Sequence, residues 1–344
     1  MVAGTEQAYQ VYGVEPSSYT RKVLGLCAAK GVPHEFKLKS LAVKAEVEAA
    51  CDGYALMPVV RAPDGSWLMD STDIALRLDE AFPDTALLPD DPALAVVVRL
   101  LDDWADEWLI RPAVHWRASH AKPRAELCQA IARNLMGFTQ ASALPAEVAD
   151  KLPRIAEKLE PFFAGIGRVN RAGPEHEDEI VDLLSRAFDL LAMHLARQPC
   201  LLGERVSLAD FALYGMLEGQ LLFDSAPRSL ITERWPAIVA YVERLRTVRA
   251  GVGAWPAGES LPRSLLGLLR YIAEDFHGFL AANAEAVAAG ANEASWDGMT
   301  MPARRYTERL RQEMAARIAA LAGPDRARLE ALVGGTGVLA VYQG

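Results

Sequence analysis

The chain has few cysteines and lacks any long hydrophobic run. Only four of its 344 residues are cysteine, and they form no Cys-x-x-Cys pair. Scattered thiols favour a reducing compartment over a disulfide framework or a zinc site. No apolar stretch reaches the roughly 18 residues that a membrane helix needs, and the first residues lack the basic start and apolar middle of a signal peptide. We therefore expect a cytoplasmic protein with no membrane partner.

A surplus of basic residues and a glycine-rich phosphate loop are also missing. The chain has 36 Lys and Arg residues against 45 Asp and Glu residues, and its formal net charge is −9. This balance argues against a nucleic-acid partner, which would require a basic face. The six histidines have no metal-ligand spacing, so we expect no metal. The rest of the composition, 51% hydrophobic, is that of a globular protein with room for two domains.

Two neighbouring stretches carry the strongest local signals. Residues 54–60 are an apolar segment that contains Met57-Pro58, and residues 67–74 place Asp70-Ser71 before an amphipathic helix. Pro58 cannot donate to a sheet, so it belongs at the start or edge of a strand, and its bond with Met57 is a candidate for the cis form. Ser71 is predicted to cap the helix, whose first turn attracts a carboxylate. A plain β-hairpin and a capped helix would give the same pattern.

The segment before residue 54 predicts a β-α-β unit. Residues 9–13 and 33–38 form short strands, and a helix between them ends at Gly31. A weaker helix is expected near residues 41–50. With the two stretches described above, the order is β-α-β followed by β-β-α, which fits a mixed sheet with helices on its faces. Ser17 lies at the turn from the first strand to the first helix.

Together these residues resemble the glutathione-binding half of the glutathione S-transferase superfamily, a thioredoxin-like domain. The resemblance rests on Met57-Pro58 and Asp70-Ser71-x-x-Ile74, preceded by the run from Ser17 to Val23. It implies that Met57, before a cis Pro58, pairs through its backbone with the cysteinyl part of glutathione. It also implies that Asp70 and Ser71 hold the γ-glutamyl end.

The resemblance gives Ser17 the position of the catalytic hydroxyl. A hydroxyl that donates to the glutathione sulfur stabilises the thiolate and lowers the pKa of the thiol from about 8.5. Thr20, Tyr12 and Tyr19 are alternative donors, and simple helix capping is the structural alternative for Ser17. Cysteine is absent from residues 17–20. A reductase would therefore need Cys27 or Cys51, which we consider the weaker interpretation.

Three lysines are available for the glycine end of glutathione, and the sequence does not choose among them. They are Lys37, Lys39 and Lys44.

The sequence of the second half of the chain predicts helices. The Pro- and Asp-rich residues 85–91 predict a linker, after which Asp91 caps and Pro92 begins a long amphipathic helix. The resemblance implies that this helix separates the subunits of a homodimer and contributes to the pocket for a hydrophobic electrophile. Large aromatic residues at helical spacing also suit a core. The pocket candidates are Trp108, His115 and Trp116.

Further along, Ser207-x-x-Asp210 is a capping box before an apolar helix, to which we assign a structural role.

The predicted fold is an α+β thioredoxin-like domain followed by an enlarged all-α glutathione transferase domain. We place the first domain at residues 1–84, the linker at 85–91, the helical domain at 92–254 and a further helical extension at 255–344. The extension has amphipathic segments near 264–289, 303–322 and 325–333. It lies beyond the resemblance and could pack on the helical domain, cover the substrate pocket or replace the dimer contact. Four arginines in it predict a solvated basic face: Arg304, Arg305, Arg309 and Arg311.

The expected function is that of a glutathione transferase. Glutathione is the co-substrate, and its thiolate attacks an electrophilic carbon of a second substrate without any metal. The alternative is a non-catalytic module of the same fold that binds glutathione or a protein.

Overall fold

The computed structural model of the chain describes residues 8–258 and 260–343. Residues 1–7, which belong to the predicted first domain and for which no signal peptide is expected, lie outside the described residues.

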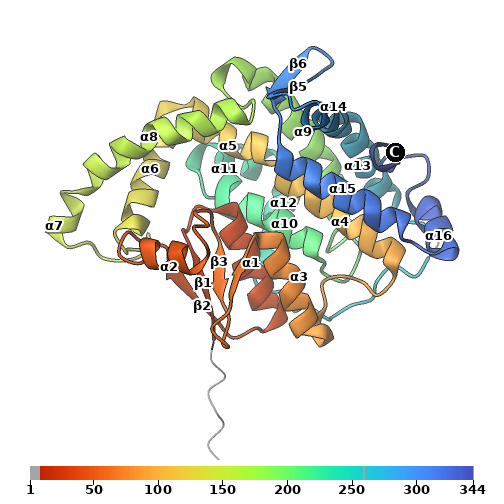
Figure 1. Cartoon of the computed structure of the whole chain (residues 1–344), viewed down its shortest axis with the longest axis horizontal. Coiled ribbons are helices and arrows are strands. Elements are labelled where there is room, and N and C mark those ends of the chain that lie inside the picture. Colours follow the sequence, from red (N-terminus) through yellow and green to blue (C-terminus); the bar gives the residue numbers. More distant parts are fainter. Residues whose placement is uncertain (1–7, 259, 344) are drawn as a thin grey trace, which may run out of the picture.

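The N-terminal domain is built on a four-stranded mixed sheet (Figure 1). The strand order is β2-β1-β3-β4; β1 and β2 are parallel and the other pairs are antiparallel. The strands are β1 (Tyr9–Gly13), β2 (His34–Leu38), β3 (Val59–Arg61) and β4 (Trp67–Met69), and the helices are α1 (Ser18–Lys30), α2 (Lys44–Ala50) and α3 (Ser71–Ala81). The predicted β-α-β and β-β-α order is confirmed.

Alternation along the strands gives the sheet two apolar faces. Val11 and Val60 lie opposite each other and pack in the main core with side chains of α1 and α3. Tyr12 and Val59 point the other way and pack against Val47 of α2. This period of two follows from the pleat of a β-strand.

The second domain is helical. Asp91 caps α4, its carboxylate accepts from the amides of Ala93 and Leu94, and Pro92 is the first helical residue, as predicted. The helices are α4 (Pro92–Glu107), α5 (Ile110–Ser119), α6 (Ala121–Leu135), α7 (Ala146–Ala149), α8 (Leu152–Val169), α9 (Glu177–Leu195), α10 (Leu208–Met216), α11 (Ser225–Arg234) and α12 (Pro236–Leu245). Shorter helical segments are η1 (Pro83–Thr85), η2 (Pro174–His176) and η3 (Leu217–Leu221).

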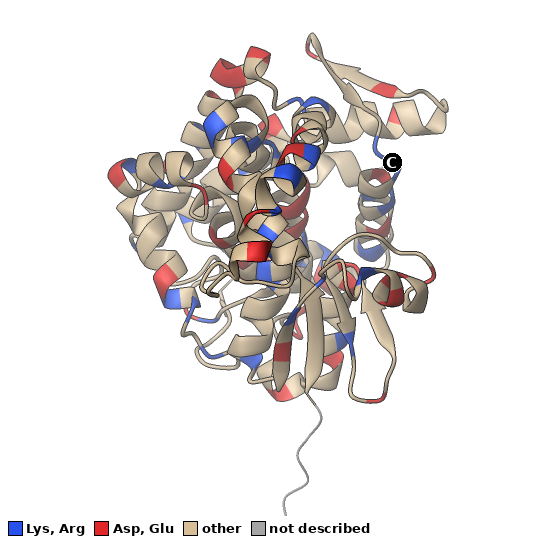
Figure 2. Ribbon diagram, turned by 90° about the vertical axis from the view of Figure 1, so that its left-hand side faces the viewer, with Lys and Arg blue, Asp and Glu red and all other residues tan. Residues whose placement is uncertain are grey.

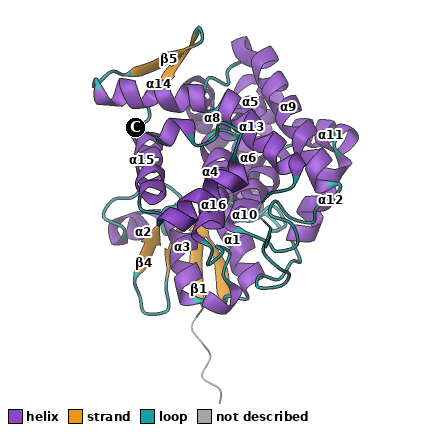
Figure 3. Ribbon diagram, turned by 90° about the vertical axis from the view of Figure 1, so that its right-hand side faces the viewer, coloured by secondary structure: helices purple, strands orange, loops and turns teal. Residues whose placement is uncertain are grey.

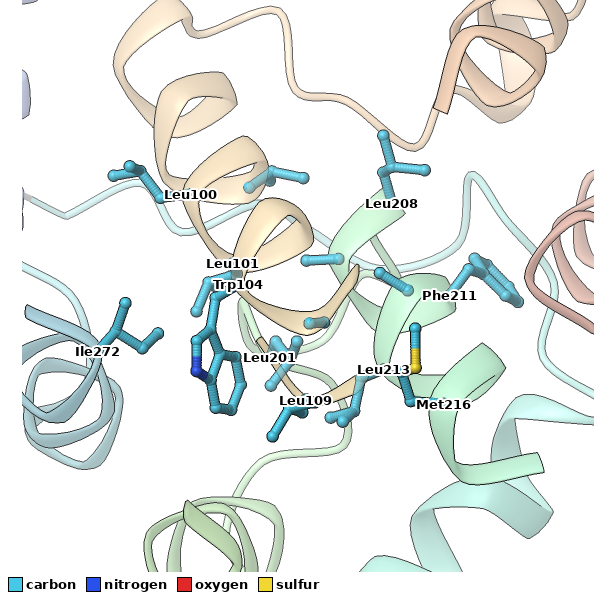
Figure 4. Close-up of a cluster of buried hydrophobic side chains, with 14 of the residues drawn as sticks. Leu100, Leu101, Trp104, Leu109, Leu201, Leu208, Phe211, Leu213, Met216 and Ile272 are labelled. Carbon is cyan, nitrogen blue, oxygen red and sulfur yellow. The ribbon is translucent and has the colours of Figure 1, made fainter. Parts of the chain in front are cut away.

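Helix α10 is the centre of the molecule, and every one of its residues is buried. It packs against α1 of the first domain and against α4, as Figure 4 shows for the side chains of Leu101, Leu208 and Phe211. The predicted capping box is present. The buried carboxylate of Asp210 accepts hydrogen bonds from the Ser207 amide and the Tyr241 hydroxyl, each at 2.8 Å. These bonds compensate for the loss of water around the carboxylate.

The C-terminal extension folds over the helical domain. It contains α13 (Arg263–Asp275), α14 (His277–Ala288), β5 (Glu293–Trp296), β6 (Met299–Pro302), α15 (Arg305–Ala319), α16 (Gly323–Val333) and η4 (Ala340–Tyr342). Helices α15 and α16 pack against α4 (Figures 1 and 3). Of the three roles that the sequence left open, packing on the helical domain is therefore realised.

Two expectations for the extension were wrong or incomplete. The hairpin of β5 and β6 was missed, although its turn residues Asp297 and Gly298, with φ of 45° and 76°, form the Asp-Gly pair typical of a tight hairpin. Arg304 is not solvated: its guanidinium donates to the Asn170 side chain at 2.8 Å and to the Glu107 carbonyl at 3.3 Å. A fixed guanidinium at a helix junction satisfies backbone oxygens that would otherwise be buried without donors.

Charged residues of both signs are interspersed along the ribbon (Figure 2). Within residues 8–258 and 260–343, no helix combines the length and the apolar composition needed to cross a membrane.

Candidate functional site

The sheet brings the three predicted glutathione-binding segments to one edge. Tyr12, near the end of β1, pairs with Val59, the first residue of β3, and Val59 pairs with Met69, the last residue of β4. The turn to Ser17 follows β1, Pro58 precedes β3, and Asp70 follows β4. These segments, far apart in sequence, therefore leave the sheet on the same side.

Ser17 is the N-cap of α1. Its backbone is extended, with φ −105° and ψ 119°, and its Oγ accepts from the Thr20 amide at 3.3 Å. Capping uses a lone pair of the oxygen and leaves the O–H free to donate. The capping role and the role of thiol donor, which the sequence presented as alternatives, are therefore compatible. Ser17 is half-buried, at the positive end of the helix dipole.

A buried arginine fixes the backbone before Ser17. Arg117 of α5 donates to the Pro16 carbonyl at 2.9 Å and to the Gly219 carbonyl at 2.8 Å, and forms an ion pair with Asp224. Its guanidinium thus joins α5, the π-helical segment η3 and the Ser17 turn. No local pattern signals this contact, because Pro16 and Arg117 are 101 positions apart.

Segment η3 presses directly on the same turn. A Cβ on Gly219 would lie 2.7 Å from Ser18 Cα and 2.8 Å from the Ser17 carbonyl carbon, and one on Gly215 would lie 2.5 Å from the Ser18 carbonyl oxygen. Gln220 also donates to Ser18 Oγ at 2.9 Å. Glycine is required at both positions, and their spacing of four inside an apolar helix was an available signal. A π-helical turn is a common feature of functional sites.

The alternative hydroxyls are buried or already engaged. Thr20 is fully buried, and its hydroxyl packs on Gly13, where a Cβ would lie 2.3 Å from it. The Tyr19 hydroxyl donates to the Asp106 carbonyl at 3.1 Å, and that of Tyr12 donates to Gln10 at 3.1 Å. Within residues 8–258 and 260–343 the Thr20 hydroxyl also has no hydrogen-bond partner, but it is fully buried, so the half-buried Ser17 is the one of the four whose free proton a ligand can reach.

The Met57–Pro58 peptide bond is cis. The loop before it is fixed by Lys39, whose buried ammonium donates to the carbonyls of Ala55 and Leu56, each at 3.0 Å. Of the three candidate lysines, Lys39 thus supports the loop.

The two other lysines lie at the surface. Lys37 forms an ion pair with Glu35, and Lys44 lies 3.9 Å from Glu48.

Asp70, and not Ser71, is the N-cap of α3, which corrects the sequence prediction. Asp70 Oδ1 accepts from the amides of Thr72 at 3.0 Å and Asp73 at 3.3 Å. Its φ of 68° and ψ of 126° lie outside the left-handed well. Such backbone strain costs about 1–3 kcal/mol and concentrates at functional positions. Ser71 is the first helical residue, and its side chain is not used as the cap.

The C-terminal extension contacts Asp70. The hydroxyl of Tyr306, at the start of α15, donates to Asp70 Oδ2 at 2.6 Å. Asp70 and Tyr306 line a small cavity of about 40 Å³ between α3, α4 and α15, together with Arg99, Asp103 and Arg309. Both signs of charge face this cavity, which suits a group that carries an ammonium and a carboxylate together.

An ion-pair network joins the two domains beneath the cavity. The buried ammonium of Lys22 lies 2.7 Å from Asp102 Oδ1 and 3.3 Å from Thr72 Oγ1. Arg99 pairs with Asp102 at 2.7 Å and with Asp103 at 3.2 Å. Burial raises the pKa of Asp103 to about 7, against the opposing effect of Arg99.

The three predicted pocket residues are not gathered at this edge of the sheet. Trp108 is buried against Phe276 and Phe279 of the extension, and its indole N–H donates to Asp275. His115 is buried within α5, and Trp116 is half-buried beside it.

The cysteines give little support to a reductase. Cys27 and Cys51 are both buried, and burial raises the pKa of the Cys27 thiol to about 12. A thiol of that pKa is protonated at neutral pH and is a poor nucleophile.

Comparison with known proteins supports the resemblance in both halves of the chain. Residues 11–86 match the model of the glutathione S-transferase N-terminal domain, and residues 174–244 match that of the glutathione S-transferase C-terminal domain. The chain is 31% identical to glutathione S-transferase omega-1 of Rattus norvegicus over 87 residues. That match covers 25% of this chain and 36% of the rat protein, so it spans about a third of that relative.

Solved structures of similar proteins include two bacterial ones. The β-etherase LigF from Sphingobium sp. strain SYK-6 has 20% identity and a TM-score of 0.49, with coverage of 70% of this chain and 95% of that one. A glutathione S-transferase of Methylobacterium radiotolerans, in complex with glutathione sulfonate, has 19% identity and a TM-score of 0.41, with coverage of 73% and 100%.

The mixed sheet with its α10-centred helical domain and the two family matches agree on one assignment, and they confirm the predicted fold class. The two matched stretches, residues 11–86 and 174–244, are a glutathione S-transferase N-terminal domain and a glutathione S-transferase C-terminal domain.

Proposed function

We propose that this protein is a glutathione transferase in which Ser17 activates the glutathione thiol. The observation that carries the proposal is the Ser17 hydroxyl at the start of α1, which caps the helix through its oxygen and keeps its proton free. A glutathione thiolate beside Ser17 would accept a hydrogen bond from the Ser17 hydroxyl and would lie at the positive end of the α1 dipole.

The other contacts of glutathione follow from the edge that Ser17 shares with Pro58 and Asp70. The backbone of Met57 would pair with the cysteinyl part, and Asp70 with Ser71 would hold the γ-glutamyl end. The strained backbone of Asp70 and the shared edge of the sheet support these roles. The mixed charge of the cavity beside Asp70 supports a γ-glutamyl group, which has an ammonium and a carboxylate on one carbon.

The reaction is attack of the thiolate sulfur on an electrophilic carbon of a hydrophobic substrate. A sulfur–carbon bond forms, the leaving group departs with its electron pair, and the thiol proton passes to solvent. Of the three predicted pocket residues, Trp108 and His115 are buried and Trp116 is half-buried, so Trp116 is the one proposed to contact this substrate. No metal takes part in this step.

We also propose a cytoplasmic location and a homodimer. Four free, buried cysteines support a reducing compartment. Because α15 and α16 already cover α4, the subunit contact in this proposal lies on another surface than α4.

The test is a pH titration of bound glutathione, followed by the ultraviolet absorbance of the thiolate, in wild type, Ser17→Ala and Ser17→Thr. We expect a thiol pKa well below the free value of about 8.5 in the wild type and a rise toward it in Ser17→Ala. Ser17→Thr keeps a hydroxyl and should retain most of the shift. Binding with the same pKa in all three proteins would remove Ser17 from the mechanism.

A non-catalytic glutathione-binding module is the second candidate. The hydrogen bond from Tyr306 to Asp70 favours it, because the extension already occupies an oxygen that the γ-glutamyl end would need. Glutathione binding with an unshifted thiol pKa in the wild type would support this candidate.

A further inference from the structure

A second group of chemically active side chains lies in the helical domain, apart from the edge of the sheet. His115 is near the end of α5, His120 directly follows that helix, and Glu177 is the first residue of α9. One ligand atom of each residue lies within 4.8 Å of the corresponding atoms of the other two. The connection between α8 and α9, residues 170–176, brings the start of α9 back to the end of α5.

His115 has the environment of a metal ligand. Its side chain is fully buried, and its Nδ1 lies 3.1 Å from the Ala172 carbonyl oxygen. A carbonyl can only accept, so Nδ1 carries the proton and Nε2 presents a lone pair. Ser119 Oγ, which also donates to Ala172, lies 3.2 Å from Nδ1. Fixing one ring nitrogen on a backbone carbonyl is how proteins orient histidines that bind metals through the other nitrogen.

The free nitrogen of His115 has no partner in the protein. Within residues 8–258 and 260–343, Nε2 is buried and makes no hydrogen bond. A buried polar atom without a partner costs free energy, so its presence calls for an explanation. The ring of His120 stands edge-on at 5.5 Å between centroids. His120 is half-buried and Glu177 is exposed, so an ion can enter from solvent.

We propose that His115, His120 and Glu177 bind one divalent transition-metal ion, of which Zn²⁺ is the representative. Two imidazoles and one carboxylate suit Zn²⁺, Co²⁺ and Ni²⁺, whereas Mg²⁺ and Ca²⁺ prefer oxygen ligands. Bonds of about 2.0–2.1 Å require the ligand atoms to approach more closely than they do here. The side chains of His120 and Glu177 have the freedom to make that movement. Three protein ligands leave a further position for water.

This site departs from the expectation that the chain binds no metal. Its signal is not visible in the sequence, because His115 and His120 are five positions apart and Glu177 follows 57 positions later. The ion would tie the end of α5 to the start of α9. Helix α5 also carries Arg117, whose guanidinium donates to the Pro16 carbonyl in the turn before Ser17. The proposal stands on the geometry of these three residues and does not depend on glutathione chemistry.

The test is a titration of untagged, chelator-treated full-length protein with Zn²⁺ and with Co²⁺. Zn²⁺ is measured by competition with a chromophoric chelator, and Co²⁺ by its visible absorption. We expect one ion per chain in the wild type and at least a tenfold loss of affinity in His120→Ala and in Glu177→Gln. Both substitutions change side chains that are not fully buried, so the fold does not depend on them. His176→Ala, a neighbouring histidine outside the set, should bind as the wild type does.

Thermal unfolding supplies an independent readout. Saturating Zn²⁺ should raise the melting temperature of the wild type and of His176→Ala, and should leave that of His120→Ala unchanged, because an ion that binds the folded state stabilises it. The proposal is overturned if no stoichiometric ion binds, if all four proteins bind equally weakly, or if His176→Ala loses as much affinity as His120→Ala.

Discussion

At the scale of single residues, the contact between Tyr306 and Asp70 decides how the extension affects the site. The tyrosine hydroxyl donates to Asp70 Oδ2 at 2.6 Å, while Oδ1 of the same carboxylate caps α3. Both oxygens of Asp70 are therefore engaged before any ligand arrives. An ammonium group from the γ-glutamyl end of glutathione has to share or displace the tyrosine.

Removal of this hydroxyl should improve glutathione binding. In Tyr306→Phe we expect the KM for glutathione to fall about two- to tenfold, since a hydrogen bond contributes about 0.5–1.5 kcal/mol and its loss frees Oδ2. The kcat should not change, because the ring and its packing remain. Steady-state kinetics and calorimetric titration with glutathione measure both quantities. A higher KM in the variant would mean that Tyr306 helps to bind glutathione and would contradict this expectation.

At the scale of elements, the close approach of η3 to the Ser17 turn depends on the absence of a side chain. The atoms that a Cβ on Gly219 would meet belong to the backbone of Ser17 and Ser18, which cannot rotate away. An added methyl group must therefore move the turn itself, η3, or both.

We expect Gly219→Ala to lower kcat by at least tenfold and to raise the thiol pKa of bound glutathione, because displacement of a catalytic group by about 1 Å can cost about a hundredfold in rate. Activity assays and the thiolate titration would record the two effects. Gly323→Ala is the matched control, since nothing lies within 4 Å of its Cβ position. Unchanged kcat and thiol pKa in Gly219→Ala would show that the turn tolerates displacement.

At the scale of the whole molecule, buried charges join the two domains. Lys22 of the first domain and Arg99 of the second share Asp102, and Asp103 lies at the end of this network. Burial raises the pKa of Asp103 to about 7, whereas an unfolded aspartate has a pKa near 3.9. The stabilising contribution of this group is therefore complete below about pH 4 and is lost as the pH rises through about 7.

Asp103→Asn should weaken this pH dependence. Between pH 5 and pH 8 the ionisation of Asp103 should reduce the free energy of unfolding by about 3 kcal/mol in the wild type, and the neutral amide removes that contribution. Urea unfolding at pH 5, 6.5 and 8 measures it. Asp84→Asn, which makes the same substitution at an exposed position, is the matched control. Equal slopes in wild type and Asp103→Asn would show that Asp103 is already ionised at pH 5.

Local features of this fold were predictable and distant contacts were not. The cap at Asp91, the capping box at Ser207 and the order of strands and helices in the first domain follow from short-range patterns, and the structure confirms them. The contact of Tyr306 with Asp70 spans 236 positions, and the hydrogen bond of Arg304 needs Asn170, which follows α8. Periodicity shows that a helix has an apolar face but does not specify its partner.

The candidate site divides in the same way. Ser17, Pro58 and Asp70 could be selected because each lies in a short sequence motif that carries the family resemblance, although the cap of α3 and the strained backbone at Asp70 were not predicted. Arg117 could not, since its importance comes from the Ser17 turn, which another part of the chain supplies; the spacing of Gly215 and Gly219 was a signal, but it does not specify the Ser17 turn as the partner.

Helices α15 and α16 cover a surface of α4, and the burial of that surface does not depend on protein concentration. A surface covered by a second subunit is exposed when dilution separates the subunits. Here the cover is joined to the rest of the chain by covalent bonds, and its effective concentration is set by the linker before α13. The contact between Tyr306 and Asp70 should therefore persist unchanged from micromolar to nanomolar protein.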